Sequence, residues 1–286
     1  MFRKILIANR GEIAVRIIRA ARELGIETVA VYSTADKEAL HTLLADEAVC
    51  IGPAKSTDSY LNMNAVLSAA VLTGSEAIHP GFGFLSENSK FATMCEEVGI
   101  KFIGPSGSVM DMMGDKINAR AQMIKAGVPV IPGSDGEVHS AEEALKVADR
   151  IGYPVMLKAS AGGGGKGIRK VERAEDLVPA FESASTEAKA AFGNGAMYIE
   201  RVIYPARHIE VQILADQFGH VVHLGERDCS LQRNNQKVLE ESPSVAIGKT
   251  IRDQIGSAAV RAAASVGYEN AGTIEFLYDE GKGEFY

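Results

Sequence analysis

The chain has 286 residues, 46% of them hydrophobic and 23% charged, a mixture that excludes a disordered or fibrous protein and leaves room for about two domains. Its formal net charge is −7 and it contains no basic run, so we expect no nucleic-acid partner. Its three cysteines are odd in number and far apart in the sequence, which favours neither a disulfide framework nor a zinc site.

The first hundred residues alternate strand and helix patterns. An apolar run at residues 4–8 predicts a buried strand, and apolar residues at helical spacing follow it until Gly25, where a helix can end. Residues 9–12 interrupt the apolar N-terminus before a signal peptide or membrane span could form, so we expect a cytoplasmic protein without membrane contact. Further strands are expected at residues 28–32, 48–51, 76–80 and 101–104. This alternation predicts a doubly wound parallel sheet in a domain that ends near Gly114.

The first strand-to-helix turn disfavours a dinucleotide site. It reads ANRGEIA, with one glycine where the fingerprint G-x-G-x-x-G has three. A short helical segment follows the sheet, and Gly127 and Pro129 close it, so we expect a linking helix there.

Two further modules are expected after residue 134. Ser140 and Glu143 form a capping box before a helix, and the strands PVMLKA and GIRKV, a helix over about residues 174–191 and the strand MYIE follow. Beyond residue 204 the alternating segments HIEVQILA, HVVHLGE and GTIEFLY predict antiparallel strands. The first group indicates a small α+β module, and the second indicates the start of another.

The run AGGGGKG at residues 161–167 does not fit a P-loop. Gly167 follows Lys166 where a P-loop has Ser or Thr, and the next segment is strand-like rather than helical. A glycine-rich hairpin can still close over a triphosphate, because residues without a Cβ let backbone N–H groups approach anionic oxygens. A flexible hairpin without a ligand is the alternative. Lys158, among apolar neighbours in the preceding strand, favours a phosphate site, since a buried lysine without an anionic partner is costly.

Seven motifs in this order along the chain resemble the biotin carboxylases of the ATP-grasp superfamily: ILIANRGEIA, HPGFGFLSEN, MGDKINAR, MLKASAGGGGKG, YIERVIYPARHIEVQIL, ERDCSLQRNNQK and GTIEFLY. The resemblance extends over the whole sequence. It implies an α/β protein with a Rossmann-like N-terminal domain followed by an ATP-grasp fold with a glycine-loop lid. The implied division is 1–114 for the Rossmann-like domain, 115–133 for a linking helix, 134–203 for the lid, and 204–286 for the start of a truncated C-terminal domain.

The same resemblance implies an ATP site. The implied contacts are Lys116, Lys158, Gly164, Gly165, Glu200, Arg201, Ile203, His208, Gln232, Asn235 and Leu277. The two lysines would bind the phosphates, where cations stabilise the charge of a transferring phosphoryl group, and the lid would exclude water. The family often has His at position 235. Asn235 cannot carry a positive charge, so we expect its contact to be weakened or changed.

The strand around residue 210 has one polar face. His208, Glu210 and Gln212 alternate with apolar residues and therefore point the same way. Of these, the resemblance implies a nucleotide contact only for His208. For Glu210 and Gln212, a solvent-exposed face fits the pattern as well as a role in a site does.

Catalytic and metal-binding residues are implied as well. Lys237 would hold bicarbonate or carboxyphosphate, and Lys116 and Lys158 would act on the ATP phosphates. Glu275 shares a strand face with Leu277, and in an ATP enzyme a carboxylate there suits Mg²⁺ or Mn²⁺ that bridges phosphates. An edge-strand glutamate that faces water is the alternative.

The last residues suggest an incomplete site. A charged glycine turn after Tyr278 and the segment GEFY predict a returning strand, whose continuation would place a second carboxylate opposite Glu275. The sequence ends first, and the family's bicarbonate-gripping residues and biotin-contacting arginine have no counterparts. We therefore expect these 286 residues alone to lack biotin-dependent ATP cleavage.

The implied activity of the parent enzyme is the carboxylation of biotin with ATP and bicarbonate, through carboxyphosphate. Biotin would be a substrate on a biotin carboxyl carrier protein, with a carboxyltransferase as a further partner. The implied setting is acetyl-CoA carboxylase and fatty-acid synthesis, with a homodimer formed through the N-terminal and C-terminal domains. Two alternatives stay open: another ATP-grasp ligase of the carbamoyl-phosphate or purine-pathway type, and a nucleotide-binding or assembly module without catalysis.

Overall fold

The computed structural model describes residues 1–286 apart from 115, 161–166 and 234–235 and apart from the side chains of residues 116, 117 and 192. The chain forms two compact units. The first comprises Met1–Ala119, Gln212–Leu224 and Ala262–Thr273, and the second comprises Arg120–Val211, Gly225–Arg261 and Ile274–Tyr286. No helix in the described ranges is long and apolar enough to cross a membrane.

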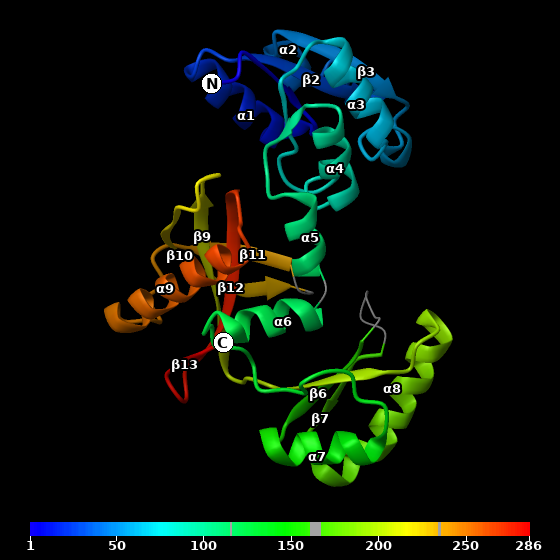
Figure 1. The fold of residues 1–286 in the computed structure, drawn as a ribbon, viewed down its shortest axis with the longest axis vertical. Helices are drawn as coiled ribbons and strands as arrows, with labels where there is room; N and C mark the ends of the chain where they lie inside the picture. The colour runs from blue at the N-terminus through cyan, green and yellow to red at the C-terminus, as the bar shows by residue number, and fades with distance from the viewer. Residues whose placement is uncertain (115, 161–166, 234–235) are drawn as a thin grey trace. The chain divides into compact units, whose positions relative to one another are not determined.

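A parallel sheet organises the first hundred residues (Figure 1). Its strands are β1 (Lys4–Ile7), β2 (Glu27–Ser33), β3 (Glu47–Gly52), β4 (Ala77–His79) and β5 (Lys101–Phe102), in the order β3-β2-β1-β4-β5. The helices around it are α1 (Gly11–Glu23), α2 (Leu40–Leu44), α3 (Met63–Leu72), α4 (Ser89–Glu97) and α5 (Gly107–Gly114), with short 3-10 turns at Thr34–Asp36 and Ser56–Asp58. Every neighbouring pair of strands is parallel, as the sequence predicts.

The central strand β1 is buried on both faces. Leu6 belongs to the core that includes residues of α3 and α4, whereas Ile5 and Ile7 belong to the core that includes Ile17 and Ile18 of α1. Successive side chains of a strand point to opposite faces, so the two cores lie on opposite sides of the sheet. Helices on both faces make this sheet doubly wound, and the inner strands β1 and β2 therefore carry runs of consecutive buried residues rather than an alternating pattern.

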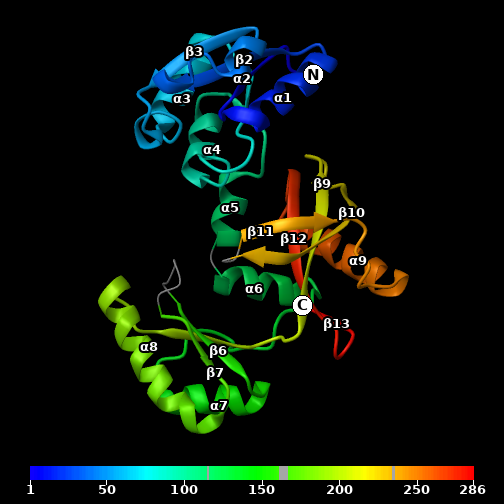
Figure 2. The same ribbon diagram turned by 180° about the vertical axis from the view of Figure 1, so that it is seen from behind.

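A three-stranded antiparallel sheet follows. Its strands are β6 (Val155–Ala159), β7 (Arg169–Val171) and β8 (Met197–Arg201), in the order β7-β6-β8. The helices in this stretch of the chain are α6 (Lys116–Lys125), which precedes the sheet in sequence, and α7 (Ala141–Ile151) and α8 (Leu177–Phe192), with a 3-10 turn at Ala174–Asp176. Residues of α7 and α8 share one core with the sheet (Figure 2). The two strands expected on either side of the glycine run are confirmed as an antiparallel pair, and residues 161–166 of that run lie outside the described residues.

The capping box at α7 forms with one change. Ser140 Oγ accepts a hydrogen bond from the Glu143 backbone N–H at 3.2 Å, as predicted. The Glu143 carboxylate, however, accepts from the backbone N–H of His139 at 3.1 Å, one residue earlier than the motif predicts. Both contacts still satisfy backbone donors at the start of the helix.

A five-stranded sheet completes the chain. Its strands are β9 (Ala206–Ala215), β10 (Val221–Arg233), β11 (Gln236–Glu241), β12 (Asn270–Asp279) and β13 (Glu284–Phe285), in the order β11-β10-β9-β12-β13, and α9 (Lys249–Ser265) connects β11 to β12. The returning strand after β12 is confirmed, because Leu277 and Tyr286 exchange two backbone hydrogen bonds of 2.8 and 2.9 Å. The sequence pattern did not predict β11 or the second half of β10, where charged residues obscure the alternation.

Candidate functional site

Lys237 on β11 is held between two carboxylates. Its ammonium donates a hydrogen bond to Glu275 Oε1 of β12 at 2.5 Å and another to Glu210 Oε2 of β9. The second oxygen of Glu210 accepts from Arg227 Nη2 of β10, and Arg227 Nε lies 3.5 Å from Glu240 Oε2. Four strands thus bring two cations and three carboxylates together.

The charges of this cluster stabilise one another. Burial alone raises the pKa of Glu210, but hydrogen bonds from Lys237 and Arg227 outweigh it and hold that pKa below its ordinary value. Burial alone lowers the pKa of Lys237, but its contacts with Glu210 and Glu275 raise that pKa above its ordinary value. The ammonium and the buried carboxylate are therefore both ionised at neutral pH.

Glu210 belongs to this cluster, although the sequence pattern left its environment undecided. Its exposed fraction is 6%, so the solvent-exposed alternative is wrong for this side chain. Gln212, for which the same alternative was open, is partly buried and donates from Nε2 to the carbonyl of Gly272 at 2.9 Å. Arg227 was not predicted at all. Alternation along one strand places Glu210 on the polar face, but its burial and its partners come from neighbouring strands.

Two other predicted residues meet in the three-stranded sheet. Lys158 of β6 forms an ion pair with Glu200 of β8, and the exposed fractions of these side chains are 34% and 18%. In the strand register Met156 faces Glu200 and Lys158 faces Tyr198, so the ion pair runs diagonally across two strands. The half-buried lysine therefore has the anionic partner that its environment demands, and this partner belongs to the protein itself.

The residues predicted at the hinge lie at the end of β8 and just beyond it, and one of them contacts the C-terminal hairpin. Arg201 Nη2 donates to the hydroxyl of Tyr286 at 2.7 Å, and its guanidinium lies 5.5 Å from the centroid of the tyrosine ring. Ile203, two residues after the end of β8, is buried. Leu277 lies on β12, where its backbone pairs with Tyr286.

The remaining described candidates lie on β9 and β10. The His208 backbone N–H donates to Ser230 Oγ at 3.0 Å, which joins these two strands. Gln232 faces Lys237 directly across the β10–β11 pair, and its side-chain amide donates to the carbonyl of Cys229 at 3.0 Å. Gln232, an implied ATP contact, and Lys237, implied to hold bicarbonate or carboxyphosphate, are therefore cross-strand neighbours.

Four predicted contacts fall outside the described residues. Gly164, Gly165 and Asn235 are not described, and Lys116 begins α6 with its side chain outside the description. Their roles stay predictions.

Glu275 can supply one ligand to a divalent cation, but not a complete cage. Its side chain is 58% exposed, and the described residues contain no group of three or more His, Cys, Asp or Glu that could hold a metal ion. Mg²⁺ commonly uses one or two carboxylates together with substrate phosphates. A single exposed carboxylate therefore suits a metal ion that binds together with a nucleotide, because the phosphates supply further oxygen ligands.

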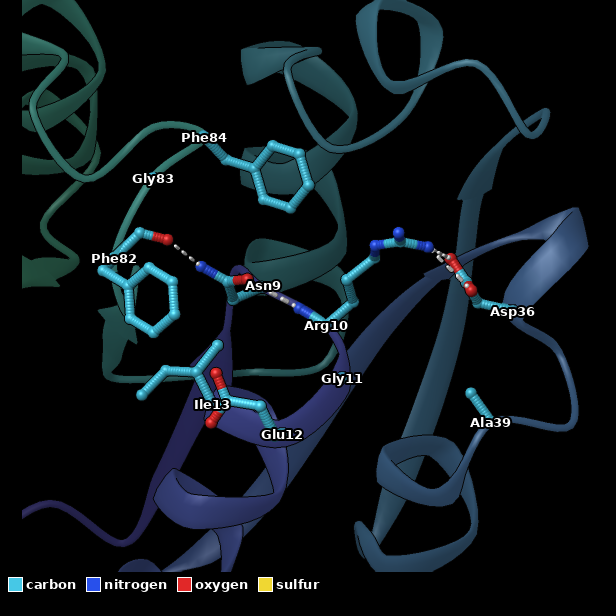
Figure 3. Close-up of a pocket in the computed structure, with 10 residues that line it drawn as sticks. All are labelled: Asn9, Arg10, Gly11, Glu12, Ile13, Asp36, Ala39, Phe82, Gly83 and Phe84. Carbon is cyan, nitrogen blue, oxygen red and sulfur yellow. Dashed lines mark hydrogen bonds and ion pairs between the residues drawn. The ribbon is translucent and has the colours of Figure 1, made fainter. Parts of the chain in front are cut away.

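A second candidate site lies in the N-terminal unit, after the carboxyl ends of β1 and β4. A pocket of about 540 Å³ lies there, and its lining includes Phe82, Gly83 and Phe84, which are drawn in Figure 3. Asn9 donates from Nδ2 to the carbonyls of Pro80 and Phe82, both at 2.7 Å, and so fixes the loop that carries these aromatic rings. Crevices at the carboxyl ends of parallel strands are where open α/β sheets commonly bind ligands.

The opposite wall of this pocket is organised around Asp36. Its carboxylate accepts hydrogen bonds from Arg10 at 3.0 Å, from Ser33 Oγ at 3.0 Å and from the hydroxyl of Tyr60 at 2.6 Å. Burial and the hydrogen bond to Asp36 raise the pKa of Tyr60 to about 12. Tyr60 also stacks on Phe84, with ring centroids 5.1 Å apart. The wall is thus connected to the aromatic loop.

Comparison with known families divides the chain into two matches. Residues 1–110 match the family described as biotin carboxylase, N-terminal domain. Residues 115–286 match the family described as carbamoyl-phosphate synthase L chain, ATP binding domain. The second match covers the Lys158 pair and the Lys237 cluster.

Individual proteins agree with these matches. The chain is 58% identical to Biotin carboxylase 1 of Bacillus subtilis over 286 residues, which cover 100% of this chain and 64% of that protein. It is similar to the biotin carboxylase-β-γ-ATP complex from Campylobacter jejuni, with a TM-score of 0.90, 52% identity, and coverage of 100% of this chain and 64% of that one. It is also similar to the biotin carboxylase domain dimer of the Hydrogenobacter thermophilus 2-oxoglutarate carboxylase, in complex with MgADP, ADP and bicarbonate, with a TM-score of 0.86, 52% identity, and coverage of 100% and 63%.

The chain spans less than two thirds of the length of each of these three proteins. Within that span, the predicted Rossmann-like domain and ATP-grasp fold are confirmed by the family and structural matches. The motifs that carried the resemblance lie in both matched regions. The chain belongs to the biotin carboxylase family.

Proposed function

We propose that this chain forms the nucleotide-binding part of a biotin carboxylase, which uses ATP and bicarbonate to carboxylate biotin on a carrier protein. The observation that carries this proposal is the Lys237 ammonium between Glu210 and Glu275, in a chain 58% identical to a biotin carboxylase. The lysine can bind the anion that reacts, and the exposed carboxylate beside it can bind the metal ion of the nucleotide.

The proposed nucleotide site uses the predicted contacts. Lys116 and Lys158 bind phosphates, with the backbone of Gly164 and Gly165 closing over them. The residues that contact the remainder of the nucleotide are Glu200, Arg201, Ile203, His208, Gln232, Asn235 and Leu277. The Lys158–Glu200 ion pair supports this arrangement. When a nucleotide binds, the Lys158 ammonium can exchange the Glu200 carboxylate for a phosphate oxygen, so it keeps an anionic partner in both states.

In the proposed reaction an oxygen of bicarbonate attacks the γ-phosphorus of ATP, and ADP leaves. The carboxyphosphate that forms breaks down to carbon dioxide and phosphate. The phosphate then takes the N1′ proton of biotin, and the nitrogen attacks carbon dioxide. Lys237 binds bicarbonate or carboxyphosphate and stabilises its negative charge, while the lid keeps water from hydrolysing the intermediate.

The donor set fits Mg²⁺ or Mn²⁺ bound together with the nucleotide. Glu275 supplies one carboxylate, and its 58% exposure leaves an oxygen accessible to such an ion. A divalent ion would neutralise charge on the transferring phosphate oxygens. The residues of the chain hold the nucleotide around it and keep the acceptor anion beside Lys237.

The proposed setting follows the family. Partners are the biotin carboxyl carrier protein and a carboxyltransferase, with a homodimer formed through the N-terminal and C-terminal domains, and the location is cytoplasmic. The pathway is acyl-CoA carboxylation, as in acetyl-CoA carboxylase and fatty-acid synthesis. The dimer named for the Hydrogenobacter relative supports the proposed assembly. The proposed domains are residues 1–114, a linking helix at 115–133, a lid at 134–203, and the start of the C-terminal ATP-grasp domain at 204–286.

A second candidate function is ligation with ammonia as the acceptor. The family match of residues 115–286, described for a carbamoyl-phosphate synthase, favours it. Release of ADP by the natural polypeptide that carries these residues distinguishes the two. We expect bicarbonate-dependent release that free biotin stimulates and ammonia does not. Stimulation by ammonia alone would identify the second function, and ATP binding without any turnover would identify a nucleotide-binding module.

A further inference from the structure

The two carboxylates that hold Lys237 differ in how firmly they are fixed. Glu210 is buried, and each of its oxygens accepts from a different cation, Arg227 or Lys237. Glu275 is 58% exposed, and Lys237 is its ionic partner within the described ranges. Releasing Glu210 would leave a buried charge unpaired, whereas releasing Glu275 returns an exposed carboxylate to water. Only Glu275 is therefore free to change partner at small cost.

We propose that Glu275 is an exchangeable ligand, which holds Lys237 in the free protein and passes to the divalent cation when a metal–nucleotide complex binds. This proposal rests on the proposed function, because it takes Glu275 as a metal ligand. Glu210 stays bound to Lys237 in both states. Transfer of Glu275 then frees one N–H of Lys237 for the acceptor anion, so metal loading prepares the anion site.

Charge balance supports this order of events. The cluster of Lys237, Arg227, Glu210, Glu240 and Glu275 has a negative formal charge, so it repels a free anion. A divalent cation on Glu275 reverses the sign. It also repels the Lys237 ammonium, which moves toward Glu210 or toward an incoming anion. An anion that arrived first would have to compete with Glu275 for the same ammonium.

Binding of Mn²⁺ in the presence of ADP tests the exchange without any turnover. Free Mn²⁺ is measured by electron paramagnetic resonance for the unaltered chain, Lys237→Met, Glu275→Gln and the double variant. In Lys237→Met no ion pair has to break, so Mn²⁺ affinity should rise about two- to fivefold, as expected for loss of one exposed ion pair. Lys237→Gln, which can still hydrogen-bond Glu210, should show the same rise. Lys249→Met is the matched control, because Lys249 is an exposed lysine paired with Asp253, and its affinity should not change.

The double variant separates exchange from a general effect of charge. If the rise acts through Glu275, Lys237→Met should produce no rise in the Glu275→Gln background. An equal rise in both backgrounds, or no rise in either lysine variant, would overturn the exchange. If Glu275→Gln leaves Mn²⁺ affinity unchanged, Glu275 is not a metal ligand, and the metal assignment in the proposed function fails with it. Weaker Mn²⁺ binding in Glu275→Gln without a rise in the lysine variants would overturn the exchange alone.

Discussion

Two polar clusters in this molecule are built in opposite ways. In the N-terminal unit, one carboxylate, Asp36, is surrounded by the donors of Arg10, Ser33 and Tyr60. In the other cluster one ammonium, that of Lys237, is shared by two carboxylates. A carboxylate can accept several hydrogen bonds at once, so the Asp36 cluster is complete in itself. In the Lys237 cluster the lysine's second partner, Glu275, is exposed and can be released at small cost. Under the proposed function, that difference separates a structural network at Asp36 from a site that receives a ligand at Lys237.

Removing the buried charge of Glu210 should have the largest effect. Glu210→Gln leaves Arg227 and Lys237 without their shared partner, so we expect the free energy of unfolding to fall by about 2 kcal/mol, somewhat less than for a fully buried pair. Urea unfolding measures it. Glu240→Gln, which removes the exposed partner of Arg227, should cost less than about 0.5 kcal/mol. Equal costs for both variants would show that Glu210 is not the anchor of the cluster.

Lys158 offers an intermediate test, on binding rather than stability. Lys158→Met should weaken ATP binding about tenfold, since one charge-assisted hydrogen bond to phosphate is lost, and should leave adenosine binding unchanged. Isothermal titration calorimetry with both ligands measures this. The control is Lys170→Met, because Lys170 is an exposed lysine on the neighbouring strand that pairs with Glu172. A parallel loss of adenosine affinity would indicate a distorted lid instead of a lost phosphate contact.

In the Asp36 cluster, removal of a single hydroxyl should lower the free energy of unfolding by less than Glu210→Gln does. Tyr60→Phe removes a hydroxyl that donates to Asp36 and accepts from the Ser33 backbone N–H at 3.0 Å. A buried N–H without its acceptor costs about 1 kcal/mol, and we expect the free energy of unfolding to fall by that amount. Thermal or urea unfolding measures it. If the cluster were instead an open ligand site, the variant would keep its stability.

The smallest effect should appear in the pH dependence of stability. The pKa of Glu210 in the folded protein lies below its ordinary value of 4.5, so its ionised form contributes stability above that value, and the contribution is lost as the pH falls through the folded pKa. The charged groups that face it are Arg227 and Lys237, with Glu240 beyond Arg227. Between pH 6 and pH 3 the unaltered chain should therefore lose more stability than Glu210→Gln. Parallel profiles in urea unfolding would contradict this account.

Much of the fold could be predicted from local patterns. Each strand of the first sheet is a short apolar run between helical segments, and that pattern depends on sequence neighbours alone. β11 and the end of β10 were missed, because their charged side chains are paired across strands and do not alternate with apolar ones. Pairing of this kind joins residues far apart in the sequence, so no local pattern contains it.

The candidate site was predicted in part for the same reason. Lys158, Glu200, Lys237 and Glu275 were identified from motifs, and the structure joins them as two ion-paired groups. The burial of Glu210 and the contribution of Arg227 depend on which strands lie beside β9. Motifs indicate which residues belong to a candidate site. The side chains that these residues contact in the absence of a ligand depend on tertiary packing, which a motif does not contain.

The most direct test of the central claim is the affinity of this chain for ATP with and without Mg²⁺, compared between the unaltered chain and Glu275→Gln. If the Lys237 cluster is the metal and phosphate end of a nucleotide site, Mg²⁺ should strengthen ATP binding in the unaltered chain. In Glu275→Gln this carboxylate ligand is lost, so the affinity for ATP in the presence of Mg²⁺ should weaken about tenfold, roughly 1.4 kcal/mol. Equal Mg²⁺-dependent affinities in the two proteins would contradict the assignment of this cluster as the reactive end of the site.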